Sequence, residues 1–535
     1  VFEDTANRWN NIDGRVSMSN LCVSGDTEVL TDKGYRKVKD LYDSQEDFNV
    51  VVDERARTMD LDNIGTSIQK STKMFKTSED AEVFKVTTLE GREISATAWH
   101  KMYVERNGDI VKIPLLDLEI GDKILVNSDS ISSRGEFHNP DLAYVAGVVA
   151  ADGTGYALRG NNYGAKISLY GDKDEVIDDI TSAIHNSLQG RDDLVERQAT
   201  LSPEFVWSGS SSRHSISSAP LYKLFKEHGY DIKEKKVQVP DFIKQSDEDT
   251  QIAFLNGIFQ MDGTITGSKK YNSISIELGS VHQDFLLDVQ KLLGTFGISS
   301  RIYASKKEDS FVMMPDGHGG EKEYLQKKSW SLRVSSMQEA TKLHDLLSWR
   351  SVHNNRWNEL TGDRVKENYN IKRNKFAIVK SIEFVGNEDV YDVTVENGHS
   401  LIFNGIVTGN CSEILQVQQP SQFDPVTGEY SEIGTDISCN LGSLNVANSM
   451  RKGKLEESVH TAINALTTVT LNTSIDRVPT VKNGNDKYHS IGLGAMSLAS
   501  FLASEKIMYG SDESLDFANV FFAAMRYHAL QASSD

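Results

Sequence analysis

A decapeptide that occurs twice is the feature that most constrains the fold of this 535-residue chain. Tyr144–Gly153 returns as Phe254–Gly263, offset by 110 residues, and both copies carry glycine at the fourth position and end in Asp-Gly. Each copy is followed by a strand-like segment, a glycine and an amphipathic helix with apolar residues at i, i+1, i+4, i+7 and i+8. Because the neighbours repeat together with the motif, the sequence predicts two copies of one α/β unit.

A β-rich pattern encloses this repeated block on both sides. Short strands separated by turn signals fill 22–138, and the same style returns in 363–410, whereas 139–362 is helical and mixed. The outer parts, 1–21 and 411–535, differ again, and the second of them has helical periodicity. The pattern predicts a multidomain chain in which one insertion lies within another.

Composition excludes several classes of protein. No apolar run reaches the roughly 18–20 residues of a membrane span, and no N-terminal segment has the pattern of a signal peptide. The net charge of −20 argues against a general nucleic-acid binder, although one domain can still carry a local basic face. Three cysteines exclude a disulfide scaffold and favour a reducing compartment. We expect a cytoplasmic protein with no membrane partner.

The cysteines mark the edges of the β-rich segments. Cys22 opens the first segment, and Cys411 follows the second directly after Asn410. Cys22 can attack the preceding carbonyl to form a thioester, and Cys411 can then take over the acyl group. Asn410 can cyclise on its own carbonyl to release 22–410, after which an S-to-N shift joins Leu21 to Cys411. The order of these groups predicts excision with ligation.

Motifs within the β-rich segments resemble those of inteins. Gly91–His100 resembles the Thr-x-x-His block of that family, and the segment from Val390 to Asn410 resembles its C-terminal block. The resemblance implies an all-β, horseshoe-like splicing fold, the Hint domain, that needs no cofactor. It also implies that Thr97 and His100 polarise and strain the first scissile amide.

The C-terminal block implies two further roles. By the resemblance, Asp392 couples the first and second steps, and His399 positions and protonates groups around Asn410. The residue before the terminal asparagine of inteins is usually histidine, and here it is Gly409. This departure leaves His399 as the residue expected to assist cyclisation.

The sequence outside the insertion resembles the large subunit of class I ribonucleotide reductases, most closely class Ib. Joining 1–21 to 411–535 restores an Asn-Leu-Cys-x-Glu segment, and Asp436–Leu444 resembles the redox-partner strand of that family. The resemblance implies a mainly helical fragment of the reductase α/β barrel. Val1 and the unremarkable C-terminal end predict that both ends are cuts through a longer product.

The reductase resemblance assigns four residues. Cys411 would carry the thiyl radical, Glu413 would be the general base, Asn20 would bind substrate, and Cys439 would be half of the reducing dithiol. It implies a ribonucleoside diphosphate substrate and a separate small subunit that holds the radical cofactor. Because the insertion separates Asn20 from Cys411, we expect the precursor to be inactive as a reductase.

The repeated decapeptide resembles the LAGLIDADG motif of homing endonucleases. Gly147 and Gly257 would let two helices approach closely, which would bring Asp152 and Asp262 together at the helix ends. The resemblance implies that this carboxylate pair holds Mg²⁺ for hydrolysis of double-stranded DNA, at a homing site in the intein-free reductase gene.

Lysines complete the nuclease hypothesis. Lys235–Pro240 resembles the block between the two motifs, which makes Lys236 or Lys235 the candidate for water activation or transition-state stabilisation, with Lys327 or Lys328 second. DNA contacts would come from local basic residues, namely Lys269, Lys270, Arg301, Lys306, Lys307, Lys372, Arg373 and Lys375.

Two alternatives stay open. A hedgehog-like autoprocessing domain would cleave without ligating, but gives no reason for Asn410-Cys411 or for the resumed reductase sequence. An inactive DNA-binding or scaffold relic would leave the chain intact.

Overall fold

The computed structural model describes most of the chain, namely residues 15–18, 22–127, 129–157, 163–170, 173–195, 200–208, 213–232, 238–271, 273–306, 308–315, 321–362, 376–395, 400–409, 415–419, 421–423, 430–436, 438, 440–473, 475–476 and 478–535. Contacts divide it into two compact units, Val1–Ser19 with Cys411–Asp535 and Asn20–Asn410. Among the described residues, no helix is both long and apolar enough to cross a membrane.

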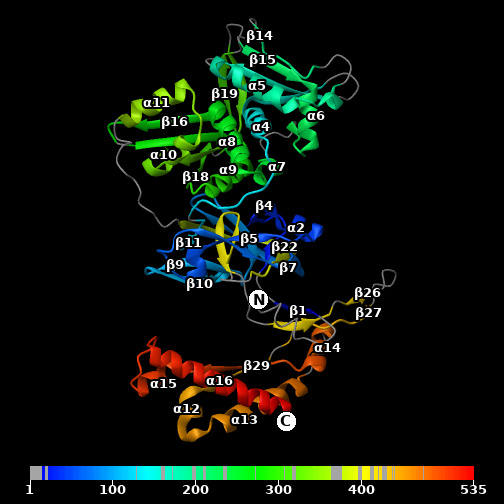
Figure 1. The fold of residues 1–535 in the computed structure, drawn as a ribbon, viewed down its shortest axis with the longest axis vertical. Helices are drawn as coiled ribbons and strands as arrows, with labels where there is room; N and C mark the ends of the chain where they lie inside the picture. The colour runs from blue at the N-terminus through cyan, green and yellow to red at the C-terminus, as the bar shows by residue number, and fades with distance from the viewer. Residues whose placement is uncertain are drawn as a thin grey trace. The chain divides into compact units, whose positions relative to one another are not determined.

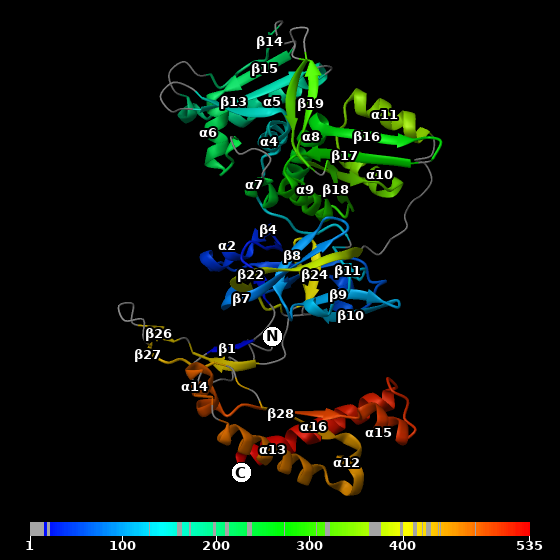
Figure 2. The same cartoon turned by 180° about the vertical axis from the view of Figure 1, so that it is seen from behind.

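A sheet of thirteen strands forms one part of the larger unit, so the chain is mixed α/β. Its order is β2-β8-β7-β22-β11-β9-β24-β23-β3-β5-β6, with β10 beside β9 and β4 beside β3. In Figures 1 and 2, yellow strands from the end of the unit lie among blue strands from its beginning. The strands are β2 (Val23–Ser24), β3 (Glu28–Thr31), β4 (Gly34–Lys37), β5 (Asn49–Asp53), β6 (Thr66–Lys70), β7 (Phe75–Thr88), β8 (Glu93–Thr97), β9 (Lys101–Arg106), β10 (Asp109–Pro114), β11 (Lys123–Leu125), β22 (Phe376–Asp392), β23 (Ser400–Phe403) and β24 (Ile406–Gly409).

Apolar side chains from both stretches build the core of this sheet. Val104 and Ile124 from the first stretch pack in one cluster with Val379, Leu401 and Phe403 from the second. All five are at most 1% exposed, and burying each contributes about 1.5–3 kcal/mol. Neither stretch can complete the core alone.

One long strand, β22, replaces two strands that the sequence pattern suggests. Alternation in 377–383 and 390–395 predicts separate strands, but β22 runs unbroken from Phe376 to Asp392. Its register against β7 shifts at four places, for instance between Val379 and Ser381. Such bulges bend a strand, and β22 also pairs with β11 and β2.

Both interruptions of the chain open between neighbouring antiparallel strands. The chain leaves the sheet after β11 and returns in β22, where Leu125 is the partner of Phe376. In the smaller unit, β1 (Arg15–Met18) pairs with β25 (Leu415–Gln418), with Met18 opposite Leu415. Insertion at such points is tolerated because the two ends already lie close together.

The repeated block has the same order of elements in each copy. Both run helix, two strands, helix, two strands, helix, and their sheets are β12-β13-β15-β14 and β16-β17-β21-β18. A hairpin, β19 (Ser310–Pro315) and β20 (Glu321–Gln326), interrupts the second copy, and α11 (Ser351–Thr361) follows it. The matched pairs are α4 (Pro140–Asp152) and α8 (Glu248–Asp262), β12 (Gly153–Ala157) and β16 (Gly263–Ser268), β13 (Tyr163–Tyr170) and β17 (Ser273–Ser280), α5 (Ile177–Leu188) and α9 (Gln283–Thr295), β14 (Val206–Ser208) and β18 (Arg301–Lys306), β15 (Arg213–Ser218) and β21 (Ser329–Val334), and α6 (Ala219–Glu227) and α10 (Met337–Leu346).

Two glycines set the approach of α4 and α8. A Cβ atom on Gly147 would lie 2.3 Å from the carbonyl oxygen of Phe254, and one on Gly257 would lie 2.4 Å from that of Tyr144. Both distances are too short for any side chain, so the backbones of the two helices touch where the repeated motif has its glycines. The contact is reciprocal, as expected for a pseudo-twofold pair.

A buried cluster of charges joins the thirteen-stranded sheet to the repeated block. Glu28 of β3 contacts Lys244 of α7 (Asp241–Lys244), with 2.7 Å between Oε1 and Nζ, and also contacts Lys291 of α9. Asp288 lies 3.3 Å from Lys244 and 2.7 Å from Lys291. Burial alone would raise the pKa of Glu28, but the two lysines outweigh it and lower that pKa to about 2. The four charges are thus mutually neutralised.

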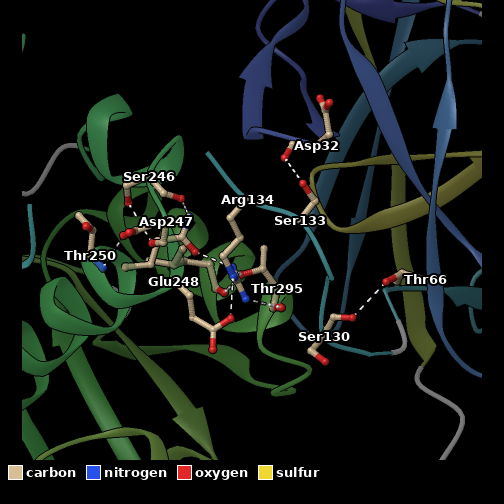
Figure 3. Close-up of polar contacts among 12 residues, drawn as sticks. Asp32, Thr66, Ser130, Ser133, Arg134, Ser246, Asp247, Glu248, Thr250 and Thr295 are labelled. Atoms are coloured by element: carbon tan, nitrogen blue, oxygen red, sulfur yellow. Dashed lines mark hydrogen bonds and ion pairs between the residues drawn. The ribbon is translucent and has the colours of Figure 1, made fainter. Parts of the chain in front are cut away.

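The connection from the sheet to the block is also held by hydrogen bonds (Figure 3). The Ser133 hydroxyl donates to the carbonyl oxygen of Asp32 at 2.8 Å, on the sheet side. Arg134 donates to the hydroxyl and carbonyl oxygens of Thr295 at 2.8 and 3.0 Å, and lies 3.3 Å from Glu248, on the block side. Sheet and block therefore share a structured polar interface.

The smaller unit is mainly helical around a parallel strand pair. β28 (Asn440–Asn445) pairs with β29 (Ile491–Met496), and β26 (Gln422–Phe423) pairs with β27 (Tyr430–Glu432). Helical periodicity over 455–471 and 516–530 predicts two helices, and both are present, as α13 (Leu455–Asn472) and α16 (Asp512–Ser534). Other helices are α12 (Val446–Met450), α14 (Pro479–Tyr488) and α15 (Leu498–Ser504).

Lys244→Met tests the buried charge cluster. The substitution leaves an excess negative charge in a buried site, so we expect the free energy of local opening of β3 and α9 to fall by about 3 kcal/mol. Native-state hydrogen exchange measures this quantity. Lys123→Met, at a half-exposed pair with Glu105, is the control and should cost less than about 1 kcal/mol. If both substitutions lower the free energy of opening by the same small amount, Lys244 does not neutralise a buried charge cluster.

Candidate functional site

Cys22 lies buried where three strands meet. Val23, the next residue, is the partner of Ala96 on β8 and of Tyr391 on β22. The backbone N–H of Thr97 donates to the carbonyl oxygen of Cys22 at 3.0 Å, and the Thr97 hydroxyl lies 3.5 Å from the same oxygen. These contacts fix the backbone of Cys22 against the end of β8.

The surroundings of the thiol keep it protonated. Burial raises the pKa of Cys22, the nearby Asp392 carboxylate raises it further, and a hydrogen bond from Thr77 lowers it in part, with a net value of about 12. The Thr77 hydroxyl donates to the sulfur at 2.6 Å. A thiol in this state is a poor nucleophile until a base removes its proton.

His100 ends the turn that follows Thr97. Its backbone N–H donates to the Thr97 carbonyl at 3.0 Å, which closes the turn. The ring is 1% exposed, and neither of its nitrogens has a hydrogen-bond partner among the described residues. Burial lowers the pKa of His100 to about 3, so the imidazole is neutral. An unpartnered buried ring costs stability, and catalytic or binding groups commonly tolerate this cost.

The last strand of the thirteen-stranded sheet, β24, lies beside the same turn. β24 ends at Gly409, and Thr408 on this strand is the partner of Met102 on β9, which begins directly after His100. A Cβ atom on Gly409 would lie 2.9 Å from the Cβ atom of Lys101. Cys22 therefore contacts Thr97, the first residue of the turn. Gly409 lies beside Lys101, the residue that follows the turn.

The structure brings four predicted splicing residues into one region. Seven other predicted catalytic residues lie outside the described residues, as do Lys235 and the predicted DNA contacts Lys307, Lys372, Arg373 and Lys375. Cys22, Thr97, His100 and Asp392 are described and lie on the strands and the turn just given. Thr77 is an additional contact of the thiol, and nothing in the sequence distinguishes it from other strand threonines. The seven catalytic residues outside the described part are Asn20, Lys236, His399, Asn410, Cys411, Glu413 and Cys439.

The two repeated aspartates are the last residues of their helices. Asp152 closes α4, and its carboxylate lies 2.5 Å from Nζ of Lys173, a residue that no sequence motif marks. Asp262 closes α8, and the ring of His353 donates to the carbonyl of the next residue, Gly263, at 3.1 Å. Carboxylates are the ligands that Mg²⁺ prefers, but the Asp152 carboxylate is paired with Lys173 in this structure.

Asp392→Asn tests the electrostatic description of the thiol. Removing this negative charge lowers the pKa of Cys22, so we expect its alkylation by iodoacetamide at pH 9 to accelerate several-fold. Asp389→Asn, an exposed carboxylate three residues away that pairs with Lys76, should leave the rate unchanged. Peptide mapping follows the Cys22 peptide alone. If Cys22 of the folded parent chain is alkylated as fast as Cys22 of the chain unfolded in urea, the thiol is not buried and protonated as described.

Comparisons with known proteins identify relatives of the whole chain. The sequence profile of the ribonucleotide reductase barrel-domain family matches residues 1–535. The ribonucleoside-diphosphate reductase NrdEB subunit alpha of Bacillus subtilis (strain 168) is 40% identical over 541 residues, which cover 100% of this chain and 49% of that protein. Another protein of that strain, ribonucleoside-diphosphate reductase subunit alpha, is 45% identical over only 125 residues, 23% of this chain and 18% of its own length.

Solved structures give only distant likenesses. A DnaB mini-intein variant covers 74% of this chain and 100% of its own, with 10% identity and a TM-score of 0.24. A variant of the homing endonuclease I-DmoI covers 39% and 96%, with 16% identity and a TM-score of 0.26. TM-scores this low do not establish a shared fold. The chain spans about half the length of the NrdEB relative, and by its match over all 535 residues it belongs to the ribonucleotide reductase barrel-domain family.

Proposed function

We propose that 22–410 is a self-splicing intein with a nested homing endonuclease. In this proposal 1–21 and 411–535 belong to a ribonucleoside-diphosphate reductase large subunit of class Ib. The observation that carries the splicing proposal is the position of the two ends of the segment. Cys22 contacts Thr97, and Gly409 lies beside Lys101, so the same short turn separates them.

The first step exchanges an amide for a thioester. The Cys22 sulfur attacks the Leu21 carbonyl, the C–N bond to Cys22 breaks, and the proton of the thiol moves to the amine that is released. His100 is suited to carry this proton, because its neutral ring has two nitrogens without partners among the described residues. Thr97 holds the Cys22 carbonyl and so fixes the attacking residue.

The later steps transfer and release the chain. The Cys411 sulfur displaces Cys22 from the thioester and becomes the carrier of the acyl group. The side-chain nitrogen of Asn410 then attacks its own carbonyl, which breaks the bond to Cys411 and forms a succinimide. An S-to-N shift completes the Leu21–Cys411 amide. In this scheme Asp392, within electrostatic reach of the Cys22 sulfur, links the first two steps, and His399 assists Asn410 in place of a histidine at 409.

The reductase proposal rests on the family membership and on the pairing of the two flanks. β1 and β25 are antiparallel partners on either side of the insertion. Ligation would turn them into a hairpin whose seven-residue loop contains Asn20, Cys411 and Glu413. The strand pairing supports a host interrupted at residue 22.

The host chemistry follows from the residues in that loop. Cys411 would form the thiyl radical, Glu413 would accept the proton of a substrate hydroxyl, Asn20 would bind the substrate, and Cys439 would reduce it with a second thiol. The substrate is a ribonucleoside diphosphate, and the partner is a small subunit that holds the radical cofactor. Cys411 cannot serve the reductase before splicing, because Asn20 and the residues after 410 are not yet joined.

The nuclease proposal rests on the reciprocal contact of α4 and α8. The glycine contact fixes the two helices at the repeated motif, and both end in an aspartate. Asp152 and Asp262 would hold Mg²⁺, which supplies charge stabilisation for phosphodiester hydrolysis. Lys236 would act on the attacking water or the transition state. The substrate is double-stranded DNA at the intein-free reductase gene, contacted by the two four-stranded sheets.

Splicing is tested by the masses of the products. We expect the freshly expressed chain to give two products, of 389 and 146 residues. Cys22→Ala should stop the first step entirely and prevent ligation, and Asn410→Ala should leave branched or N-terminally cleaved species. His100→Ala should slow thioester formation by about 10²-fold or more. Asp389→Asn, on the exposed side of β22, is the control that should splice normally.

Two outcomes would replace the splicing proposal. Cleavage at residue 22 without a 146-residue product would favour the hedgehog-like alternative. A chain that stays intact without any substitution would favour the inactive relic.

Nuclease activity is tested with Asp152→Asn. We expect Mg²⁺-dependent cutting of DNA that carries the uninterrupted reductase gene, and loss of that cutting in the variant. Asp141→Asn, at the opposite end of α4, is the matched control. Full activity of Asp152→Asn would remove this carboxylate from the mechanism, and an unchanged splicing pattern in the same variant would separate the two activities.

A further inference from the structure

The helical unit contains a cluster of potential metal ligands that none of the proposed chemistry uses. Glu456 and His460 lie on α13, and His528 lies on α16. One ligand atom from each residue can be chosen so that all three atoms lie within 4.8 Å of one another. Figures 1 and 2 show the two helices side by side, and Val459 packs with Met525 in the core between them.

The spacing of these residues explains why they meet. Glu456 and His460 are four residues apart, so they lie on one face of α13. The imidazole rings of His460 and His528 have their centroids 6.5 Å apart. The helices that carry them are fixed by apolar packing, so the two imidazoles are positioned by the fold rather than by surface side-chain rotation.

The two imidazoles have unused nitrogens. Nε2 of His460 and Nδ1 of His528 are buried from solvent and have no hydrogen-bond partner among the described residues. A buried polar atom without a partner costs about 1–3 kcal/mol. Both histidines belong to the cluster that contains Glu456. A metal ion bound there would give both unpartnered imidazoles a ligand bond.

We propose that Glu456, His460 and His528 bind a divalent transition-metal ion, with Zn²⁺ as the expected ion. Two imidazoles and one carboxylate are a common ligand set for zinc with an open fourth position. Imidazole ligands also favour transition metals over Mg²⁺ and Ca²⁺. Ligand atoms of a tetrahedral zinc lie about 3.3 Å apart at normal bond lengths, and the exposed Glu456 side chain can move to close the remaining distance. The ion ties α13 to α16, with water as the fourth ligand.

The proposal is independent of splicing, since all three residues follow residue 411. Precursor and ligated product therefore serve equally in the test. Zn²⁺ binding is measured by equilibrium dialysis and by the rise in Tm of the helical unit. We expect one equivalent per chain, and at least a tenfold loss of affinity in His460→Gln, His528→Gln and Glu456→Gln, because even altering residues that only support metal ligands costs about 10–100-fold.

Glu457→Gln provides the matched control. This residue is adjacent to Glu456 but pairs with Lys454 at 2.8 Å and lies outside the cluster. It should keep the parent affinity and the parent rise in Tm with Zn²⁺. The proposal is overturned if the parent binds no zinc. It is equally overturned if binding survives all three substitutions and disappears on alkylation of the thiols, because the ion would then sit on cysteine.

Discussion

The structure depends on strand pairing between segments that lie far apart in the sequence. β11 is the neighbour of β22, and β9 is the neighbour of β24, so the sheet cannot form until the chain returns after the repeated block. Buried backbone N–H and C=O groups need partners, and here each stretch supplies them to the other. The same arrangement occurs in the smaller unit, where β1 and β25 pair across the whole insertion. Each interruption occupies the place of a hairpin loop.

This constraint explains how Cys22 and Gly409, which are 387 residues apart in sequence, come to one turn. The pairing of β8 with β2 brings Cys22 to Thr97, and the pairing of β9 with β24 brings Gly409 to Lys101. Because the turn between β8 and β9 joins Thr97 to Lys101, it also brings Cys22 and Gly409 near each other. The low-polarity surroundings of this turn hold the Cys22 thiol and the His100 ring uncharged. In the proposed splicing reaction, the first step therefore begins with proton transfer between neutral groups.

Buried ion pairs join the repeated block to the thirteen-stranded sheet. Glu28 follows Cys22 by six residues, and among the described residues the cations that contact its carboxylate are Lys244 and Lys291 of the block. Deleting the block would leave this carboxylate and the surface around it without partners. Any shortened form of the segment therefore requires a neutral residue at 28, because an unpaired buried charge destabilises strongly.

The sequence allowed prediction of the local motifs, but not of contacts between distant residues. The repeat, its glycines and aspartates, and the helices α13 and α16 follow from periodicity, and the structure contains them. Glu28, Lys244 and Lys291 are dispersed over the chain, so no local pattern reveals their cluster. Thr77 and Lys173 carry no spacing signal either. Glu456 and His460 have helical ligand spacing, but their partner His528 is recognisable only after α16 packs on α13.

The central claim, that the paired strands allow the backbone to be exchanged between residues 21 and 411, is tested most directly by sequencing the ligated junction. Tandem mass spectrometry of the digested smaller product should find a peptide in which Leu21 is followed immediately by Cys411 through an ordinary amide bond. If the peptides that end at Leu21 and begin at Cys411 occur only separately, or if Leu21 is always followed by Cys22, the account is wrong.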